Sequence, residues 1–185
     1  MALTYSTMMP IEASIPPFSL TDVVSGKTFN QNALKGDHGL LVMFICNHCP
    51  YVVHVQEEMT KMANEFMKKG IGMVAISAND VNRYPDDDPV HLKEQAEKLG
   101  FNFPYLYDET QSVAKAFDAV CTPDFFLFDE ELKCVYRGRM DESSPGNGKP
   151  VTGNDLREAM TNLLEGNSIT KDQIPSMGCG IKWKS

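Results

Sequence analysis

The sequence predicts an α/β fold in which helices flank both faces of a central mixed β-sheet, with a β-hairpin near the amino terminus. Residues 39–46 and 71–77 are continuous apolar runs of strand length, which is typical of strands buried on both faces. An amphipathic segment, residues 50–69, separates them, so the two strands are expected to be parallel and joined by a right-handed crossover. Residues 125–129 and 133–140 predict a further hairpin, which makes the sheet mixed.

The first hairpin is predicted over residues 18–30, where two short strand-forming stretches flank a Ser-Gly-Lys turn. In the helix that follows the first buried strand, Pro50 fits the first turn, because its missing N–H would have had no partner there. Gly70 suits the carboxyl-terminal cap of this helix. Apolar side chains recur every three or four residues along one helix face: Val52, Val55, Met59, Met62 and Phe66.

The second half of the chain alternates polar loops with helices. Residues 79–89 predict a polar loop with two prolines, in which the acidic run Asp86, Asp87 and Asp88 is expected to be solvated. Helices are predicted over three further segments: residues 90–99, 111–118 and 152–166. In the last of them Thr152 can cap the amino end, and Gly166 follows the carboxyl end.

The length of 185 residues predicts a single domain over residues 1–185, with a loose lead-in over about residues 1–15 and an irregular tail over about residues 167–185. A formal net charge of −8 argues against nucleic acid and anionic membrane surfaces as partners. The amino-terminal stretch lacks a basic segment followed by an apolar one, so no signal peptide is expected. A cytoplasmic location is therefore expected, where thiols are kept reduced.

The stretch "FICNHCPYV" (residues 44–52) places Cys46 and Cys49 where a central strand gives way to a helix. Free N–H groups and the dipole of a helix start stabilise a thiolate, and the pKa of such cysteines can fall from ~8.5 to as low as ~3.5. Two intervening residues let the sulfurs form a disulfide. The first cysteine of such a pair is normally the more exposed, so Cys46 is predicted to attack a substrate and Cys49 to resolve the intermediate.

The immediate neighbours of the pair are Asn47, His48 and Pro50. A protonated His48 could stabilise the thiolate of the first cysteine, or it could be a solvated spacer. Farther along, Thr122 and Pro123 precede a predicted strand. If their peptide bond is cis, the backbone of Thr122 could face a substrate chain.

The chain has five cysteines, and the other three are weighed as additional thiols. Cys121 could be a third redox thiol or a small buried residue, and burial is the commoner fate. Cys134 is expected to pack within a strand, whereas Cys179 could be a resolving thiol or dispensable. The pair could also be half of a zinc site or inert. Potential further ligands are His48, His54, Cys121 and Cys179, but no second pair has the usual spacing, so no metal is expected.

These residues resemble those of the thioredoxin superfamily, and more closely the peroxiredoxin-like redoxin (AhpC/TSA) group. The matching stretches include "FSLTDVVSGKTFN", "CNHCPYV", "CTPDFFLFD" and "PSMGCGIKW". The resemblance implies a thioredoxin-like fold, a cis peptide before Pro123, and redox chemistry by Cys46 and Cys49 with no cofactor beyond their disulfide. It implies a protein disulfide, a small thiol or a peroxide as substrate, and an electron donor of the thioredoxin or glutathione type.

Two departures from these families bear on activity. Thioredoxin carries a buried aspartate in the strand before its cysteines, where this chain has Leu40. Peroxiredoxins carry a Pro-X-X-X-Thr-X-X-Cys pattern; aligning Cys49 with its cysteine puts Cys46 in place of the threonine and Val42 in place of the proline. Arg137 or Arg139 could supply the positive charge used by peroxiredoxins. Three hypotheses follow: an antioxidant thiol–disulfide oxidoreductase, a thiol peroxidase, or a non-catalytic metal-binding or scaffold domain.

Overall fold

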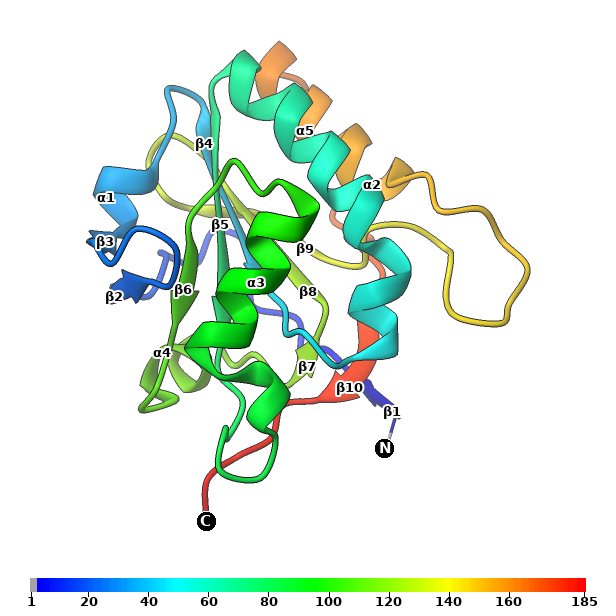
Figure 1. Ribbon diagram of the computed structural model, residues 1–185. Helices are drawn as coiled ribbons and strands as arrows, with labels where there is room; N and C mark the ends of the chain where they lie inside the picture. The colour runs from blue at the N-terminus through cyan, green and yellow to red at the C-terminus, as the bar shows by residue number, and fades with distance from the viewer. Residues whose placement is uncertain (1–2) are drawn as a thin grey trace.

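The apolar run "GLLVMF" forms β4 (Gly39–Phe44), the centre of a seven-stranded mixed sheet in the computed structural model, which describes residues 3–185 (Figure 1). All six residues of β4 are buried. It pairs in parallel with β5 (Ile71–Ser77) and antiparallel with β8 (Asp124–Phe128). The strand order is β3-β2-β6-β5-β4-β8-β9, so the two predicted buried runs lie side by side as expected.

The outer strands come from two hairpins and one short segment between helices. The first hairpin is β2 (Ser19–Asp22) with β3 (Thr28–Asn30), and the second joins β8 to β9 (Cys134–Gly138). Both hairpins were predicted. The remaining strand, β6 (Tyr105–Tyr107), was not, because three residues are too few to show an alternating pattern. It bridges β5 and β2 and so connects the first hairpin to the rest of the sheet.

Helices cover both faces of the sheet, which confirms the predicted α/β class (Figure 1). One face is covered by α2 (Pro50–Phe66), α3 (Pro89–Leu99) and α5 (Asn154–Glu165), and the other by α1 (Gln31–Leu34) and α4 (Ser112–Ala116). A 3₁₀ turn, η1 (Met67–Lys69), extends α2 to Gly70, whose left-handed backbone ends it as predicted. A second 3₁₀ turn, η2 (Pro85–Asp87), lies in the loop before α3.

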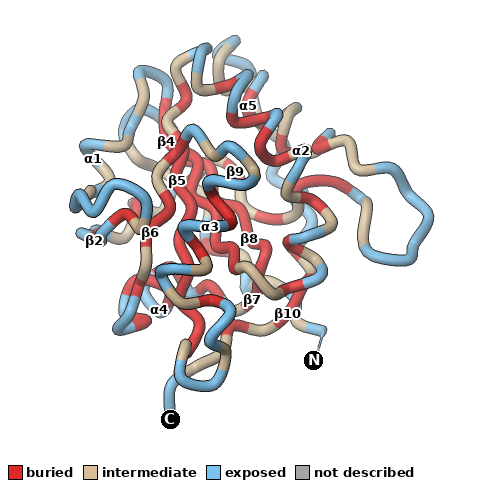
Figure 2. The backbone as a smooth tube through the Cα atoms, viewed as in Figure 1, coloured by how far each residue is buried: buried red, intermediate tan, exposed pale blue. Residues whose placement is uncertain are grey.

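The core follows from the alternation of side chains along β4. Leu41 and Met43 point to the face that carries α2, where they pack against Val52 and Met59. Leu40, Val42 and Phe44 point to the opposite face. There they pack with Phe126 of β8 and with Phe117, the residue that ends α4. Figure 2 shows the buried residues concentrated along the central strands and the inner faces of the helices.

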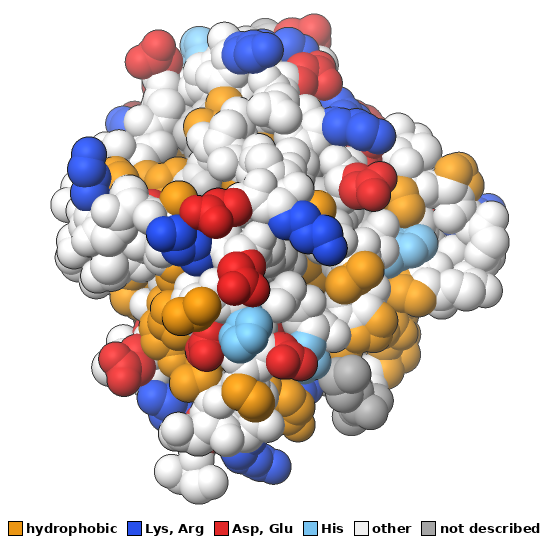
Figure 3. Space-filling model, in the orientation of Figure 1, with side chains coloured by type: hydrophobic (Ala, Val, Ile, Leu, Met, Phe, Trp, Pro, Cys, Tyr) orange, Lys and Arg blue, Asp and Glu red, His pale blue; other side chains and the backbone are white. Residues whose placement is uncertain are grey.

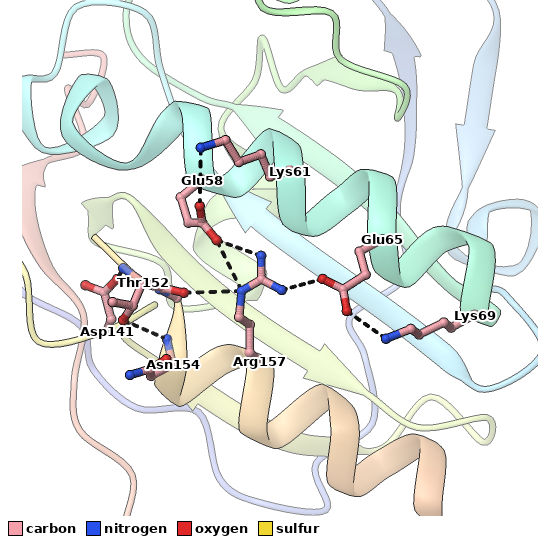
Figure 4. A network of polar contacts seen from close by, with 9 residues as sticks. Glu58, Lys61, Glu65, Lys69, Asp141, Thr152, Asn154 and Arg157 are labelled. Carbon is pink, nitrogen blue, oxygen red and sulfur yellow. Dashed lines mark hydrogen bonds and ion pairs between the residues drawn. The ribbon is translucent and has the colours of Figure 1, made fainter. Parts of the chain in front are cut away.

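Helix α5 is tied to α2 by Arg157, whose guanidinium bonds Glu58 at 2.6 Å and Glu65 at 2.6 Å (Figure 4). Its N-cap is Gly153, with a φ of 68°, rather than the predicted Thr152. The reason is Asp141, whose carboxylate accepts hydrogen bonds from the backbone N–H groups of both residues, at 2.7 and 2.6 Å. An acceptor from outside the helix therefore replaces a local cap.

A second, three-stranded sheet joins the two ends of the chain. Strand β10 (Met177–Gly180) lies between β1 (Leu3–Tyr5) and β7 (Cys121–Thr122), antiparallel to both. The expected loose lead-in and irregular tail are therefore wrong at these strands; Met1 and Ala2 lie outside the described residues. Strands of two to four residues carry no periodic signal, and pairing between distant segments forms them.

Acidic and basic side chains are interspersed over the face seen in Figure 3, with hydrophobic side chains between them. Across residues 3–185, no helix has both the length and the apolar character needed to cross a bilayer.

Candidate active site

The two cysteines of "CNHC" lie in the short connection between β4 and α2. Cys46 follows β4 by two residues, and Cys49 is the N-cap of α2, with Pro50 as the first helical residue. Cys49 thus sits at the start of a 17-residue helix, where the helix dipole favours a negative charge on its sulfur. Both residues are free thiols.

Both sulfurs converge on Thr122. The Cys46 Sγ lies 3.4 Å from the Thr122 hydroxyl, and the protonated Cys49 Sγ donates to the Thr122 carbonyl at 3.3 Å. The Thr122–Pro123 peptide bond is cis, as the resemblance implied. In this conformation the Thr122 carbonyl accepts from Cys49, and β10 pairs with the strand of Thr122, so a contact between the Thr122 backbone and a substrate stays a prediction.

The contacts around the pair favour a thiolate on Cys49. The Cys46 thiol donates a hydrogen bond to it, and further hydrogen bonds come from Cys179 and the backbone of Val52; together they outweigh burial and lower the pKa of Cys49 to about 5. The pKa of Cys46 is raised, because it is the donor to Cys49 and because it is buried beside the negative charge of Asp87. The two thiols therefore titrate as one unit, and its first ionisation gives up the Cys49 hydrogen bond to the Thr122 carbonyl.

The predicted exposure of Cys46 is wrong. Only 1% of Cys46 and 0% of Cys49 is accessible to solvent. The loop between β5 and α3 packs over this segment: Gln95 of α3 donates to the Cys46 carbonyl at 3.4 Å, and Asp87 bonds the residues that follow it. A substrate disulfide can reach either sulfur only after a local movement.

Asp87 is fully buried, so the expectation of a solvated acidic run is wrong at this residue. One carboxylate oxygen accepts from the backbone N–H groups of Asn47, at 2.8 Å, and His48, at 3.2 Å. The other accepts from the Asn79 amide at 2.8 Å and bonds the His48 ring. Burial opposes ionisation of Asp87, but the His48 and Asn79 hydrogen bonds outweigh it and lower its pKa.

His48 is held by two neighbours on one side of the pair. Its Nδ1 bonds Asp87, and its ring stacks on Tyr84 with the ring centres 5.1 Å apart. The Asp87 hydrogen bond raises the pKa of His48. Because the buried carboxylate lies next to the imidazole, it offsets the charge that was expected to stabilise a Cys46 thiolate.

One group of possible metal ligands is present among residues 3–185. Ligand atoms of Cys46, His48 and Asp87 lie within 4.8 Å of one another. Cys49 and the other ligands suggested by the sequence do not belong to this group, and the Asp87 oxygens already accept four hydrogen bonds. The arrangement is a hydrogen-bonded support for the cysteine segment.

The remaining cysteines have different surroundings. Cys121 is buried in β7, and burial raises its pKa. Cys134 is buried on the far face of the sheet, where burial raises its pKa to about 12. Cys179 of β10 lies opposite Thr122 and hydrogen-bonds the Cys49 thiol, and burial raises its pKa to about 12.

A cavity of about 130 Å³ opens beside Pro123. Its walls come from residues that flank the thiols in the sequence, including Tyr51, His54, Ser176 and Met177. The His54 Nε2 is buried without a hydrogen-bond partner. The cavity thus lies next to the proline that follows Thr122, and the His54 Nε2 is an unpaired polar group in its wall.

The arginines considered for a peroxidase are engaged elsewhere. Arg137 donates to the Met9 carbonyl at 2.6 Å and to Gln173 at 2.8 Å. Arg139 is paired with Asp155 at 2.6 Å. Neither guanidinium is among the groups that shift the pKa of Cys46 or Cys49.

The family model for redoxin matches residues 10–156. The chain belongs to the redoxin family. The resemblance inferred from "CNHCPYV" and its companion stretches is thereby confirmed. This redoxin is 53% identical to an uncharacterized conserved protein of Geobacillus kaustophilus, whose crystal structure has a TM-score of 0.98; the match covers 100% of this chain and 97% of that one.

Two further relatives carry descriptive names. The thioredoxin domain of a thiol-disulfide oxidoreductase from Bacteroides vulgatus has a TM-score of 0.58 at 22% identity, over 70% of this redoxin and 89% of that chain. It confirms the thioredoxin-like fold. The thiol-disulfide oxidoreductase ResA of Halalkalibacterium halodurans is 25% identical over 127 residues, which cover 68% of this redoxin and 67% of ResA.

Proposed function

We propose that this redoxin is a thiol–disulfide oxidoreductase that cycles Cys46 and Cys49 between dithiol and disulfide. The observation that carries the proposal is the convergence of both sulfurs on Thr122, with the Cys46 thiol donating to the Cys49 sulfur and lowering the pKa of Cys49. Sulfurs so placed can both attack a disulfide and form one. The likeness to ResA, which is named for this reaction, supports the same class.

The proposed cycle begins at Cys49. Its thiolate attacks one sulfur of a substrate disulfide, forming a mixed disulfide while the other substrate sulfur leaves as a thiolate and takes up a proton. Cys46 then loses its proton and attacks the Cys49 Sγ, so that the Cys46–Cys49 disulfide forms and the second substrate thiol is released. This order reverses the roles predicted from sequence, because Cys49, rather than Cys46, receives the hydrogen bonds that stabilise a thiolate.

The substrate and donor classes follow from this chemistry. A protein disulfide or a small-molecule disulfide would be reduced, and a donor of the thioredoxin or glutathione type would return two electrons to the Cys46–Cys49 disulfide. The cycle uses no cofactor other than this disulfide. We place the cycle in the cytoplasm as an antioxidant activity, since a pair that rests as a dithiol needs a reducing compartment.

Single-cysteine variants test the proposal. Wild-type protein should reduce insulin in the presence of dithiothreitol, and Cys46→Ser and Cys49→Ser should each abolish turnover. Cys46→Ser should in addition trap a mixed disulfide with a labelled disulfide substrate, whereas Cys49→Ser should not. Trapping by Cys49→Ser alone would restore the order predicted from sequence, and turnover unaffected by both variants would contradict the proposal. Cys134→Ser, on the far face of the sheet, is the matched control.

Hydroperoxide reduction is a second candidate, and one contact favours it. The Cys46 thiol bonds the Cys49 sulfur from the position that a threonine holds in the peroxiredoxin pattern. The Cys49 thiolate would attack the peroxide to give a sulfenic acid and an alcohol or water, and Cys46 would then condense with it to give the disulfide and water. Stopped-flow consumption of hydrogen peroxide no faster than that by free cysteine would remove this candidate.

The third candidate is a non-catalytic role in which Cys46, His48 and Asp87 bind a metal ion. Protein purified without chelator would then contain one equivalent of zinc by elemental analysis. Metal content well below one equivalent, together with insulin reduction, would favour the redox cycle.

A further inference from the structure

We infer that Cys179 is a third redox thiol, which competes with Cys46 for a disulfide bond to Cys49. The inference rests on the proposed function and extends it. In this arrangement Cys49 is a shared sulfur with two alternative partners, one in the connection after β4 and one in the carboxyl-terminal strand β10. The oxidised protein is then a mixture of two disulfide isomers.

The first support is the position of β10. Cys179 is the register partner of Thr122, the residue on which the sulfurs of Cys46 and Cys49 converge. The Cys179 thiol and its backbone N–H both hydrogen-bond Cys49. Cys49 therefore lies between two thiols that each donate to it.

The second support is the backbone of β10 itself. A Cβ on Gly178 would lie 1.9 Å from the Thr122 carbonyl oxygen, which no side chain can occupy. Only glycine at this position lets β10 approach the Thr122 carbonyl so closely. The close approach brings the next residue, Cys179, to the sulfur that bonds the same carbonyl. Cys179 itself is buried, with 3% of its surface exposed.

The exchange balances without an outside oxidant. Starting from the Cys46–Cys49 disulfide, the Cys179 sulfur gives up its proton and attacks the Cys49 Sγ. The Cys49–Cys179 bond forms, the Cys46–Cys49 bond breaks, and Cys46 leaves as a thiolate that takes up the proton. The oxidation state of the protein does not change in this exchange, and only the location of the disulfide changes. Cys46 is thereby returned to the thiol form before the donor reduces the protein.

Peptide mapping tests the inference, because trypsin separates the relevant sulfurs. Cys46 and Cys49 lie in one tryptic peptide, residues 36–61, and Cys179 lies in another, residues 172–182. After equilibration with oxidised glutathione and alkylation, a disulfide between these two peptides is expected in the wild type. In Cys46→Ala the linked species should become the main oxidised form, and in Cys49→Ala it should be lost.

Substitutions in β10 provide the matched controls. Gly178→Ala should reduce the linked species severalfold, because it pushes β10 away from Thr122. A Cβ on Gly180, in the same strand, would meet no atom closer than the Thr4 side chain at 3.1 Å, so Gly180→Ala should keep most of the linked species. Cys179→Ser should lose the link and still form the Cys46–Cys49 disulfide. Cys134→Ser should behave as the wild type.

The outcomes separate this inference from the proposed function. If the Cys46–Cys49 disulfide forms and insulin is reduced, but no linked peptides are found in the wild type or in Cys46→Ala, the inference is wrong and the proposed function stands. If neither disulfide forms and insulin is not reduced, the proposed function fails as well. A stoichiometric metal that involves Cys179, detected by elemental analysis and lost in Cys179→Ser, would also overturn the inference.

Discussion

Asp87 fixes the segment that carries the thiols by using both of its carboxylate oxygens. It bonds the backbone of Asn47 and His48, the His48 ring and the Asn79 amide, and it is fully buried. A buried carboxylate with four hydrogen bonds stabilises its surroundings only while those bonds are complete. The first prediction at the residue scale therefore concerns this side chain.

Asp87→Asn should lower the free energy of unfolding by about 1–3 kcal/mol, because a neutral amide cannot satisfy all four donors. Chemical denaturation with a fluorescence or circular-dichroism readout measures the loss. Asp86→Asn is the matched control, since Asp86 is exposed and only its backbone carbonyl bonds Asn47, at 2.9 Å. Equal stability of the two variants would contradict the role of Asp87.

The destabilisation by Asp87→Asn should also depend on pH. The pKa of Asp87 is lowered, so its contribution is present above its ordinary value of 3.8 and is lost as the pH falls through the folded pKa. The pKa of His48 is raised, so its contribution is present below its ordinary value of 6.5 and is lost as the pH rises through the folded pKa. The difference in free energy of unfolding between Asp87→Asn and the wild type should therefore be largest between pH 3.8 and pH 6.5 and should shrink below and above this range.

The thiolate on Cys49 gives the next residue-scale prediction. Cys46→Ala removes the thiol that donates to Cys49, and a hydrogen bond to a charged group is worth about 1.5–3 kcal/mol. The pKa of Cys49, about 5 in the wild type, should then rise by about 1–2 units. Cys46→Ser retains a donor and should shift it less. Ultraviolet absorbance of the thiolate, or the rate of Cys49 alkylation, followed as a function of pH measures the shift in the pKa of Cys49.

The sequence located the proposed reacting thiols better than it predicted their environment. Cys46, Cys49 and the Thr122–Pro123 pair were found because a strand-to-helix junction and a proline before a strand are local features. Asp87 could not be separated from Asp86 and Asp88, since nothing in three consecutive acids shows which one is buried. The contact of Cys179 with Cys49 depends on the pairing of Cys179 with Thr122, and 56 residues separate these two in the sequence, so no local pattern reveals it.

At the scale of elements, Arg157 is the main polar link between α2 and α5 (Figure 4). Arg157→Met should lower the free energy of unfolding by about 1 kcal/mol, because Arg157 bonds two glutamates and is only 25% exposed. The loss should shrink at high salt, which screens the ion pairs. Lys149→Met removes the same charge from an exposed pair and should change stability little. Denaturant midpoints at low and high salt measure both.

The predicted elements and the missed ones differ in what forms them. The buried runs of β4 and β5 and the apolar stripe of α2 carry their structure in their own periodicity, so they were predicted with nearly correct bounds. Strands β1, β6, β7 and β10 have two to four residues each and exist because distant backbone groups pair with them. The N-cap of α5 was misplaced for a similar reason, since Asp141 bonds it from outside the helix.

At the scale of the whole molecule, the small sheet ties both ends of the chain to the thiol site. Deleting residues 1–6 removes β1 and leaves β10 with one paired edge. Hydrogen exchange should then rise at residues 177–180 and 121–122 and stay unchanged in β4 and β5. Mass spectrometry of deuterated peptides measures this, and exchange that rises equally in all strands would contradict a local role for β1.

The pairing of β1 with β10 has a practical consequence for anything attached to the amino terminus of the chain. A fusion partner joined to the amino terminus starts beside the strand that contains Cys179 (Figure 1). A flexible tether there would hold its cargo at millimolar effective concentration near the sulfurs, on the order expected for short linkers. Tethered disulfides should therefore be processed at protein concentrations where the same disulfides, free in solution, are left untouched.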